Sequence, residues 1–153
     1  MRQNPDVLVI GEILDAETIE LVLNAAESGT LVLTTIHSAS VTQVLDRISS
    51  YFPEEAQKHI LTRLSLILKG IIVQELFPRI IGDEGLVLAT EVFLVNDSGK
   101  KIIREADLKS IPDYILRGKS QGMQTMKESI ENLVNKGIID TGYSREFLPL
   151  YNT

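Results

Sequence analysis

Two short apolar runs near the start of the chain constrain its fold more than any other feature. They are Val7–Ile10 and Leu31–Leu33, and neither alternates with polar residues, which is typical of strands covered on both faces of a parallel sheet. The segment between them has apolar residues at helical spacing, namely Ile19, Leu21, Val22, Ala25 and Ala26. Strand, helix and strand in this order make the βαβ unit of a parallel sheet. The sequence therefore predicts an α/β fold.

Each of these runs is followed by a polar residue, Glu12 after the first and His37 after the second. Ligands of open parallel sheets bind beyond the carboxyl ends of the strands, so we expect these two side chains to lie side by side there. A carboxylate at that place can hold Mg²⁺, directly or through water, against nucleotide phosphates, and the imidazole can contact the terminal phosphate or orient a water. A turn or cap residue and a structural histidine are the competing interpretations of the same two residues.

The next part of the chain predicts two helices and a hairpin. Asp15 is a suitable N-cap for the helix between the two strands, and Gly29 suits the end of that helix. Ser40 is a suitable N-cap for the first of the two later helices. Pro53 and the two acids after it predict a helix that runs to Lys69 and is ended by Gly70. The expected strands cover Ile71–Ile80 and Leu86–Val95, around the turn Gly82-Asp83-Glu84-Gly85.

From Ile102 onward the pattern is helical, so we place a boundary near residue 97, with an α/β part over 1–96 and a small helical part over 97–153. Asn96–Lys101 is polar and turn-like, and helices are expected at Ile102–Ala106, Ser110–Arg117, Met123–Lys136 and Ser144–Leu148. Gly137 is expected to end the third of them.

Composition excludes several classes of protein. The chain has 153 residues, a net charge of −6 and no cysteine, so disulfides and thiolate metal sites are excluded and a broad basic surface for nucleic acid is not expected. No apolar run approaches the roughly 20 residues of a membrane helix, and no signal peptide is recognisable. The expected location is cytoplasmic.

Three stretches carry a resemblance to a known family. RQNPDVLVIGEILD, AAESGTLVLTTIHSAS and LDRISSYFPEE resemble the second half of the motor ATPase domain of the secretion and type IV pilus families. FPEE and the later GMQTM are more similar to the pilus-retraction branch than to the type II secretion branch, which usually has a four-cysteine zinc insertion. The resemblance extends from Arg2 to about Ile139 and implies a partial RecA-like P-loop NTPase core, with parallel strands, helices and a hairpin, before the helical part.

The resemblance implies roles for individual residues. Gly11 and Glu12 match the family's atypical Walker B motif, so Glu12 would contact Mg²⁺ through water at an ATP site. His37 matches the His-box histidine, the presumed sensor of the γ-phosphate, and Arg47 matches a His-box arginine that couples the nucleotide site to subunit contacts. Asp6 matches the acid of a Pro-Asp pair before the strand, with no clear role. Such motors are hexameric rings that act on the pilus platform proteins of the inner membrane, so peripheral membrane association through partners is implied.

The sequence departs from the family in three places. Leu14 stands where an arginine is usual, and Thr30 stands where a histidine is usual. The third departure is larger, because no G-x-x-x-x-G-K-[ST] motif is present; Gly118-Lys119-Ser120 lacks the upstream glycine, which is Asp113 here. The family's acidic segment between P-loop and Walker B is missing as well. We therefore interpret the chain as a C-terminal fragment of a longer ATPase.

Two expectations follow from the missing motif. The isolated chain should neither bind ATP tightly nor hydrolyse it, because the main ligands of the phosphates are absent. It should also expose a parallel sheet edge and an apolar face, which favours a dimer or a domain swap. Two other interpretations stay open: a non-catalytic interaction or oligomerisation domain derived from a secretion ATPase, and a receiver-like α/β domain, which the lack of an acidic pair after the first strand disfavours.

Overall fold

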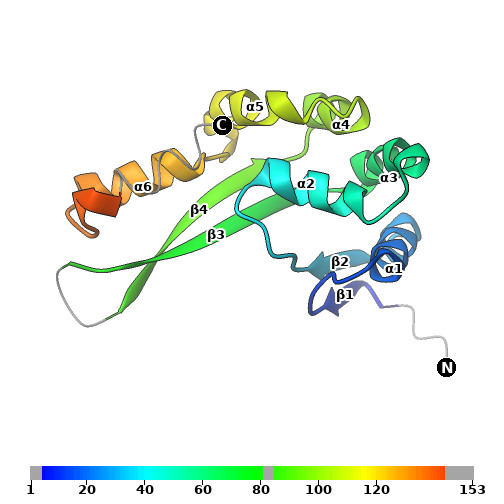
Figure 1. The fold of residues 1–153 in the computed structure, drawn as a ribbon, viewed down its shortest axis with the longest axis horizontal. Helices are drawn as coiled ribbons and strands as arrows, with labels where there is room; N and C mark the ends of the chain where they lie inside the picture. Colours follow the sequence, from blue (N-terminus) through cyan, green and yellow to red (C-terminus); the bar gives the residue numbers. More distant parts are fainter. Residues whose placement is uncertain (1–4, 81–84, 144–153) are drawn as a thin grey trace.

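The computed structural model describes residues 5–80 and 85–143, and Figure 1 shows how their elements are arranged. A small parallel pair of strands lies below helices α1, α2 and α3, and a long antiparallel hairpin extends away from them (Figure 1). Helices α4 and α5 lie across the top, and α6 lies along the hairpin (Figure 1). The sequence prediction of a mixed α/β chain that ends in helices agrees with this arrangement.

The first unit is the predicted βαβ motif. Strands β1 (Val7–Ile10) and β2 (Leu31–Thr34) pair in parallel, and α1 (Ala16–Glu27) connects them. The Asp15 side chain accepts a hydrogen bond from the backbone N–H of Thr18 at 2.7 Å, as expected of an N-cap. Gly29 has a φ of +100°, a conformation that favours glycine after a helix.

One detail of α1 was wrongly predicted. Leu21 was expected on the inward side, but its side chain is 54% exposed, whereas Leu23 is buried at 1%. The buried side passes through Ile19 and Leu23, four residues apart, and each residue turns a helix by about 100°. Leu21 lies two residues from both, so it points to the opposite side.

Helices α2 (Val41–Ser50) and α3 (Glu54–Ile67) follow β2. Ser40 caps α2 by accepting from the N–H of Gln43 at 3.2 Å, and α3 starts after Pro53, as predicted. The end of α3 was wrongly predicted, because Gly70 does not end this helix but begins the next strand. A Cβ at Gly70 would lie 2.9 Å from the carbonyl oxygen of Phe93, so the close approach of the neighbouring strand requires glycine.

Strands β3 (Gly70–Pro78) and β4 (Leu86–Leu94) form the predicted antiparallel hairpin, with Gly70 opposite Leu94 and Pro78 opposite Leu86. Most of the predicted turn, 82–84, lies outside the described residues. One face of the hairpin is buried and includes Val73, Phe77, Ala89 and Phe93. Alternation with a period of two places the other residues of each strand on the opposite face.

The helical part begins earlier than predicted. Helix α4 spans Asp97–Arg104 and is capped by Asn96, so the expected turn at 96–101 is wrong. The polar character of this stretch suggested a turn, but it lies in the helix, and a Cβ at Gly99 would lie 3.0 Å from the hydroxyl oxygen of Tyr114. Glycine at position 99 therefore serves close packing inside a helix, because the Tyr114 ring must approach the backbone.

The remaining helices are the short η1 (Leu108–Ser110) and η2 (Lys119–Gln121), α5 (Ile111–Arg117) and α6 (Met126–Asn135). Helix α6 begins three residues later than predicted, because Gln124 pairs with Val92 of β4 and Thr125 and Glu128 form a capping box. Gly137 follows the helix with a φ of +65°. The helix expected at Ser144–Leu148 lies outside the described residues.

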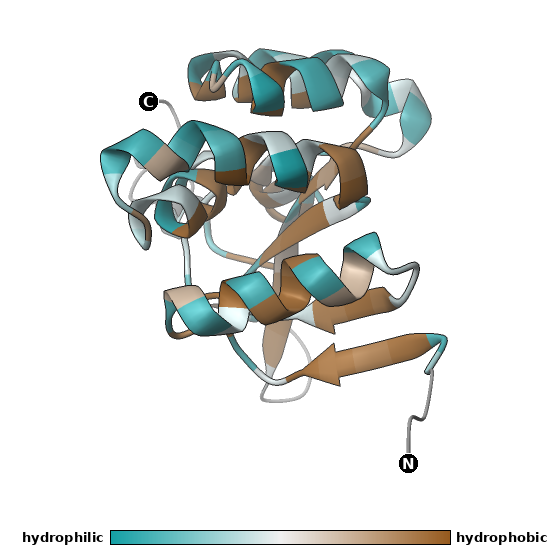
Figure 2. Ribbon diagram, turned by 90° about the vertical axis from the view of Figure 1, so that its right-hand side faces the viewer, coloured by the Kyte–Doolittle hydropathy of each residue, from teal (hydrophilic) through white to brown (hydrophobic). Residues whose placement is uncertain are grey.

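The buried apolar side chains form one cluster that extends from Ile13 to Ile139 and includes residues on both sides of position 97. Figure 2 shows the brown, apolar strands of the parallel pair beneath α1, whose colours alternate along the helix. Packing between α3 and α4 continues the core across position 97. The division into parts 1–96 and 97–153 stays a prediction.

Arg63 on α3 joins this helix to α1 of the βαβ unit by hydrogen bonds. Its guanidinium donates to Glu20 and to both carboxylate oxygens of Glu27 at 2.7–2.9 Å, and to the side chain of Asn24 at 2.8 Å. Only 17% of the Arg63 side chain is exposed. The hydrogen bonds from Arg63 lower the pKa of Glu27 and those to Glu27 and Glu20 raise the pKa of Arg63.

Arg63→Ala is expected to lower the free energy of unfolding by about 1–2 kcal/mol, because it removes several charge-assisted hydrogen bonds to carboxylates that are themselves partly exposed. Since the pKa of Glu27 is lowered in the folded chain, the stabilisation is present at neutral pH and is lost as the pH falls through that lowered value. Urea unfolding at neutral and acidic pH measures both effects. Lys58→Ala on the exposed side of α3 is the control, and equal losses for the two variants would contradict this role.

Candidate functional site

The loops that leave β1 and β2 are joined by two hydrogen bonds. The backbone N–H of Ile13 donates to the carbonyl of Thr35 at 2.8 Å, and the hydroxyl of Thr35 donates to the carbonyl of Gly11. The two loops therefore stay side by side beyond the last paired residues, Ile10 and Thr34. A Cβ at Gly11 would meet no atom within 4 Å, so packing among the described residues does not require glycine there.

These loops bring together the acid and the imidazole that the sequence singled out. The Nε2 atom of His37 lies 3.5 Å from Oε2 of Glu12. Both side chains face solvent, with His37 89% exposed and Glu12 45% exposed. The pair stands beyond the carboxyl ends of two parallel strands, where α/β sheets bind their ligands. The predicted juxtaposition is therefore present, and its role in nucleotide chemistry stays a prediction.

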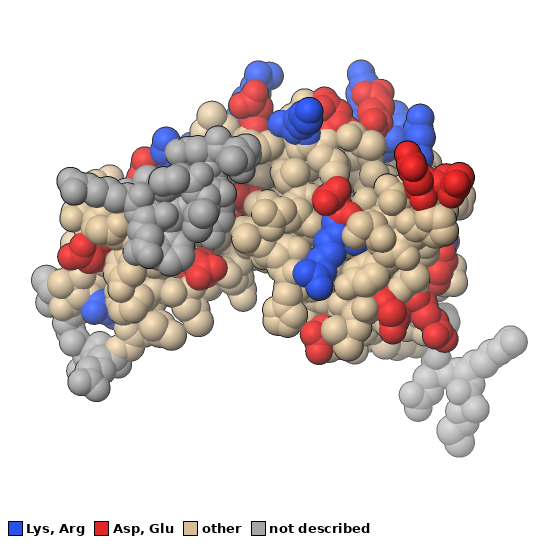
Figure 3. Space-filling model, viewed as in Figure 1, with Lys and Arg blue, Asp and Glu red and all other residues tan. Residues whose placement is uncertain are grey.

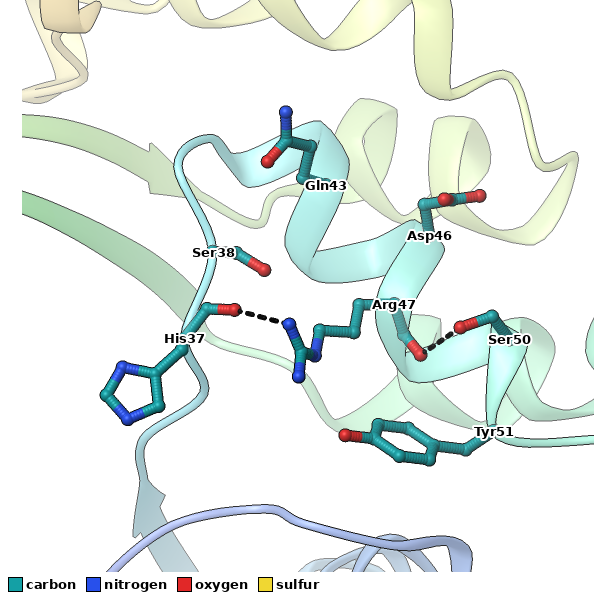
Figure 4. A pocket seen from close by; sticks show the side chains of 7 residues that line it. All are labelled: His37, Ser38, Gln43, Asp46, Arg47, Ser50 and Tyr51. Carbon is teal, nitrogen blue, oxygen red and sulfur yellow. Dashed lines mark hydrogen bonds between the residues drawn. The ribbon is translucent and has the colours of Figure 1, made fainter.

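Arg47 contacts the backbone of His37, and its hydrogen bond goes to that carbonyl. Its guanidinium donates from Nη1 to the carbonyl oxygen of His37 at 3.1 Å. Figure 4 shows this bond in a pocket formed by the loop before α2, one side of α2 and the residue that follows the helix. The pocket is lined by polar groups and one tyrosine ring: His37, Ser38, Gln43, Asp46, Arg47, Ser50 and Tyr51.

The other positions with an expected role lie around the same sheet edge or away from it. The backbone carbonyl of Asp6 accepts from the N–H of Leu31, and the hydroxyl of Thr30 donates to the carbonyl of Pro5 at 3.3 Å. Both contacts are at the start of the strands, at the end opposite to Glu12. Leu14 is 64% exposed, so the residue that replaces the family arginine is a free apolar side chain next to the loop.

The donor set tests whether this site fits Mg²⁺. Among the residues that the structure describes, no three histidine or acidic side chains gather closely enough to hold a metal ion by themselves. Mg²⁺ bound with nucleotide phosphates usually needs only one or two protein carboxylates and keeps several waters. One exposed carboxylate, Glu12, therefore fits an ion whose other ligands are phosphates and water, and would not fit a metal held by protein alone.

Sequence reasoning missed one residue near the site, Glu91 on β4. Its side chain is buried, and Oε1 accepts a hydrogen bond from the N–H of Val41 at the start of α2, at 2.7 Å. A signal was available, because Glu91 falls on the inward-facing positions of the strand together with Ala89 and Phe93. An acid at an inward position of a strand indicates a specific partner in the core.

Comparisons with known proteins place the chain in a family. The family described as type II/IV secretion system protein matches residues 1–142. The chain belongs to this family. It is 37% identical over 146 residues to the type IV pilus retraction ATPase PilT of Pseudomonas aeruginosa, which covers 95% of this chain and 42% of the relative. It is also 37% identical to a twitching motility protein of Neisseria gonorrhoeae over 139 residues, or 91% of this chain and 37% of the relative.

A solved structure supports the same placement within the type II/IV secretion family. The crystal structure of the pilus retraction motor PilT with bound ADP superposes with a TM-score of 0.82 at 38% identity, over 95% of this chain and 40% of that one. The predicted fold, a part of the ATPase fold, and the predicted resemblance to the retraction branch are both confirmed. The chain spans about two fifths of the length of the PilT proteins that it matches.

Proposed function

We propose that these 153 residues form the C-terminal part of a motor ATPase that powers pilus retraction by ATP hydrolysis. The observation that carries the proposal is the pairing of Glu12 and His37 at 3.5 Å, beyond the carboxyl ends of β1 and β2. Membership of the type II/IV secretion family and the similarity to PilT support it. The phosphate-binding loop, which is absent from this sequence, would come from residues outside it.

The two side chains would serve different parts of the nucleotide. Mg²⁺, when bound, neutralises charge on the phosphates. Glu12 would hold this ion through a water, and Gly11 beside it leaves open space for the approach of the ligand. Nε2 of His37 is exposed and can donate a hydrogen bond to an oxygen of the terminal phosphate. Arg47 holds the His37 backbone in place through its hydrogen bond. A movement of the His37 loop would therefore move the guanidinium and change its contact with a neighbouring subunit.

The assembly and partners belong to the same proposal. We infer a hexameric ring that works in the cytoplasm against the pilus platform proteins of the inner membrane, without nucleic acid. On the face drawn in Figure 3, several lysine and arginine side chains lie among acidic ones along the upper edge, over α4 and α5, and others lie near the centre and at the lower left, so they form no single basic patch on that face. None of the helices in 5–80 and 85–143 is long and apolar enough to cross a membrane.

A fusion protein tests the proposed function. The part of P. aeruginosa PilT that the match leaves uncovered would be joined to this chain in place of its own matched region. The fusion is expected to release phosphate from ATP, whereas the 153-residue chain alone is expected to show neither tight binding nor turnover. A folded, assembled fusion without hydrolysis, or hydrolysis by the isolated chain, would contradict the proposal.

A non-catalytic interaction domain is the second candidate, and the exposed apolar surface favours it. The outer face of the parallel pair carries Val7, Val9, Leu31 and Leu33, which are 48–71% exposed. On the hairpin, Ile72, Leu76, Leu86 and Leu88 are 44–61% exposed on the face opposite the core. Contiguous apolar surface of this kind marks an interface. A folded fusion that assembles but does not hydrolyse ATP would favour this candidate.

We expect the isolated chain to self-associate through the outer face of β1 and β2, with a second copy covering Val9 and its neighbours. Sedimentation over a concentration series should show a dimer or a larger species. Val9→Lys should shift the chain toward the monomer, because a buried ammonium without a partner is costly. Leu116→Lys, at an apolar side chain of α5 that is 53% exposed, is the control. A wild-type chain that is monomeric at all concentrations would contradict this expectation.

A further inference from the structure

Glu91 is a buried acid to which the proposed nucleotide site gives no role. It lies on β4 opposite Val73 of β3, and only 9% of the residue is exposed. Its neighbours on the same face of the strand, Ala89 and Phe93, are fully buried. A carboxylate in such surroundings is costly unless hydrogen bonds compensate for the lost water. Its partners should therefore reveal what it does.

The partners are the starts of two helices that are far apart in the sequence. The N–H of Val41, the first residue of α2, donates to Oε1 at 2.7 Å. The backbone N–H of Met126, the first residue of α6, interacts with the same carboxylate and lowers its pKa. The first amides of a helix have no partner within it, and helix starts favour negative charge. Burial raises the pKa of Glu91, and the two amides act in the opposite direction.

Each helix start leads to a different region. Only three residues separate Val41 from His37, and Arg47 on the same helix binds the carbonyl of His37. On the other side, α6 is attached to β4 on either side of Glu91. The N–H of Thr90 donates to the Ser129 hydroxyl at 3.0 Å, and Val92 pairs with Gln124. The carboxylate thus stands where these two sets of contacts meet.

We propose that Glu91 is a positioning residue that couples the start of α6 to the start of α2, and through α2 to the His37 loop. The inference rests on the proposed function for its purpose, since it links the C-terminal helix to the nucleotide side of the sheet. A shift of α6 against β4 would change the hydrogen bonds of one carboxylate, which also holds α2.

Amide hydrogen exchange of the 153-residue chain tests the first half of the proposal. Glu91→Ala is expected to speed exchange at both Val41 and Met126 by at least about fivefold relative to Leu61 inside α3, because both amides lose a buried acceptor. Glu91→Gln keeps one acceptor oxygen, so it should speed exchange mainly at one of the two amides. If Glu91→Ala does not fold, Glu91→Gln alone decides. Unchanged relative exchange at both amides in Glu91→Gln would overturn the proposal.

A double-mutant cycle tests the coupling itself. Thr125→Ala removes the capping box of α6 without touching α2, and it is expected to shift the NMR signals of His37 in the wild-type background. In the Glu91→Gln background the same change should shift them by less than about half as much. Ser28→Ala, at the end of α1, is the control and should leave no such difference. An equal His37 shift in both backgrounds would overturn the coupling. These readouts need no nucleotide, so they are separate from the hydrolysis test.

Discussion

In the fusion with PilT, Glu12→Gln is expected to lower the rate of ATP hydrolysis by about two to three orders of magnitude. The change preserves the shape of the side chain and removes its charge, so the residue can no longer attract Mg²⁺ through water or accept a proton. Because Glu12 is 45% exposed, the folded chain should lose less than about 0.5 kcal/mol of stability. Steady-state phosphate release and urea unfolding, measured on the same preparations, separate the two effects.

Glu17→Gln is the matched control for this experiment, because Glu17 is an exposed acid in the first turn of the neighbouring helix α1. It makes the same chemical change and should leave the rate of hydrolysis within about twofold of the unmodified fusion. A fusion with Glu12→Gln that retains most of its rate would remove Glu12 from the proposed machinery. It would leave the family assignment intact, since that rests on the whole matched region.

Phe93→Ala is expected to reduce the free energy of unfolding by about 3–5 kcal/mol, the loss that is typical of a large aromatic ring removed from a packed core. Phe93 is fully buried on β4, and its ring makes a T-shaped contact with the ring of Tyr114, with centroids 5.5 Å apart. Tyr114 in turn donates its hydroxyl hydrogen to the carbonyl of Leu94 at 3.0 Å. The cavity would therefore loosen the attachment of α5 to the hairpin as well as the hairpin itself.

Leu88→Ala offers the comparison within the same strand. Leu88 lies on the opposite face of β4 and is 44% exposed, so its removal should cost less than about 1 kcal/mol. Thermal and urea unfolding of both variants measure the difference. A loss for Phe93→Ala as small as that for Leu88→Ala would mean that the face we assign to the core is not the stabilising one.

The local elements of this chain could largely be predicted from the sequence. Asp15 and Ser40 cap their helices as expected, because a cap depends on a side chain and an amide that are only three residues apart. The two strands before Glu12 and His37, and hence the meeting of these side chains, also followed from the pattern of apolar runs. The roles of these residues in hydrolysis stay predictions.

Other features depend on which surfaces meet in three dimensions. The polar stretch 96–101 suggested a turn and Gly70 a helix end, but Tyr114 packs against Gly99 and Phe93 approaches Gly70 from elsewhere in the chain. The start of α6 was placed too early because Gln124 pairs with a strand more than thirty residues away in sequence, an interaction that helical periodicity cannot show.

The sequence by itself determined the helix caps, the strand pattern and the two polar residues at the strand ends, since these depend on neighbours along the chain. Only the tertiary structure decided that α1 buries Leu23 rather than Leu21, and that the buried carboxylate of Glu91 on β4 accepts a hydrogen bond from Val41 at the start of α2. The physical reason is that burial and long-range hydrogen bonds arise when distant segments pack together, and a local pattern specifies a face without specifying what covers it.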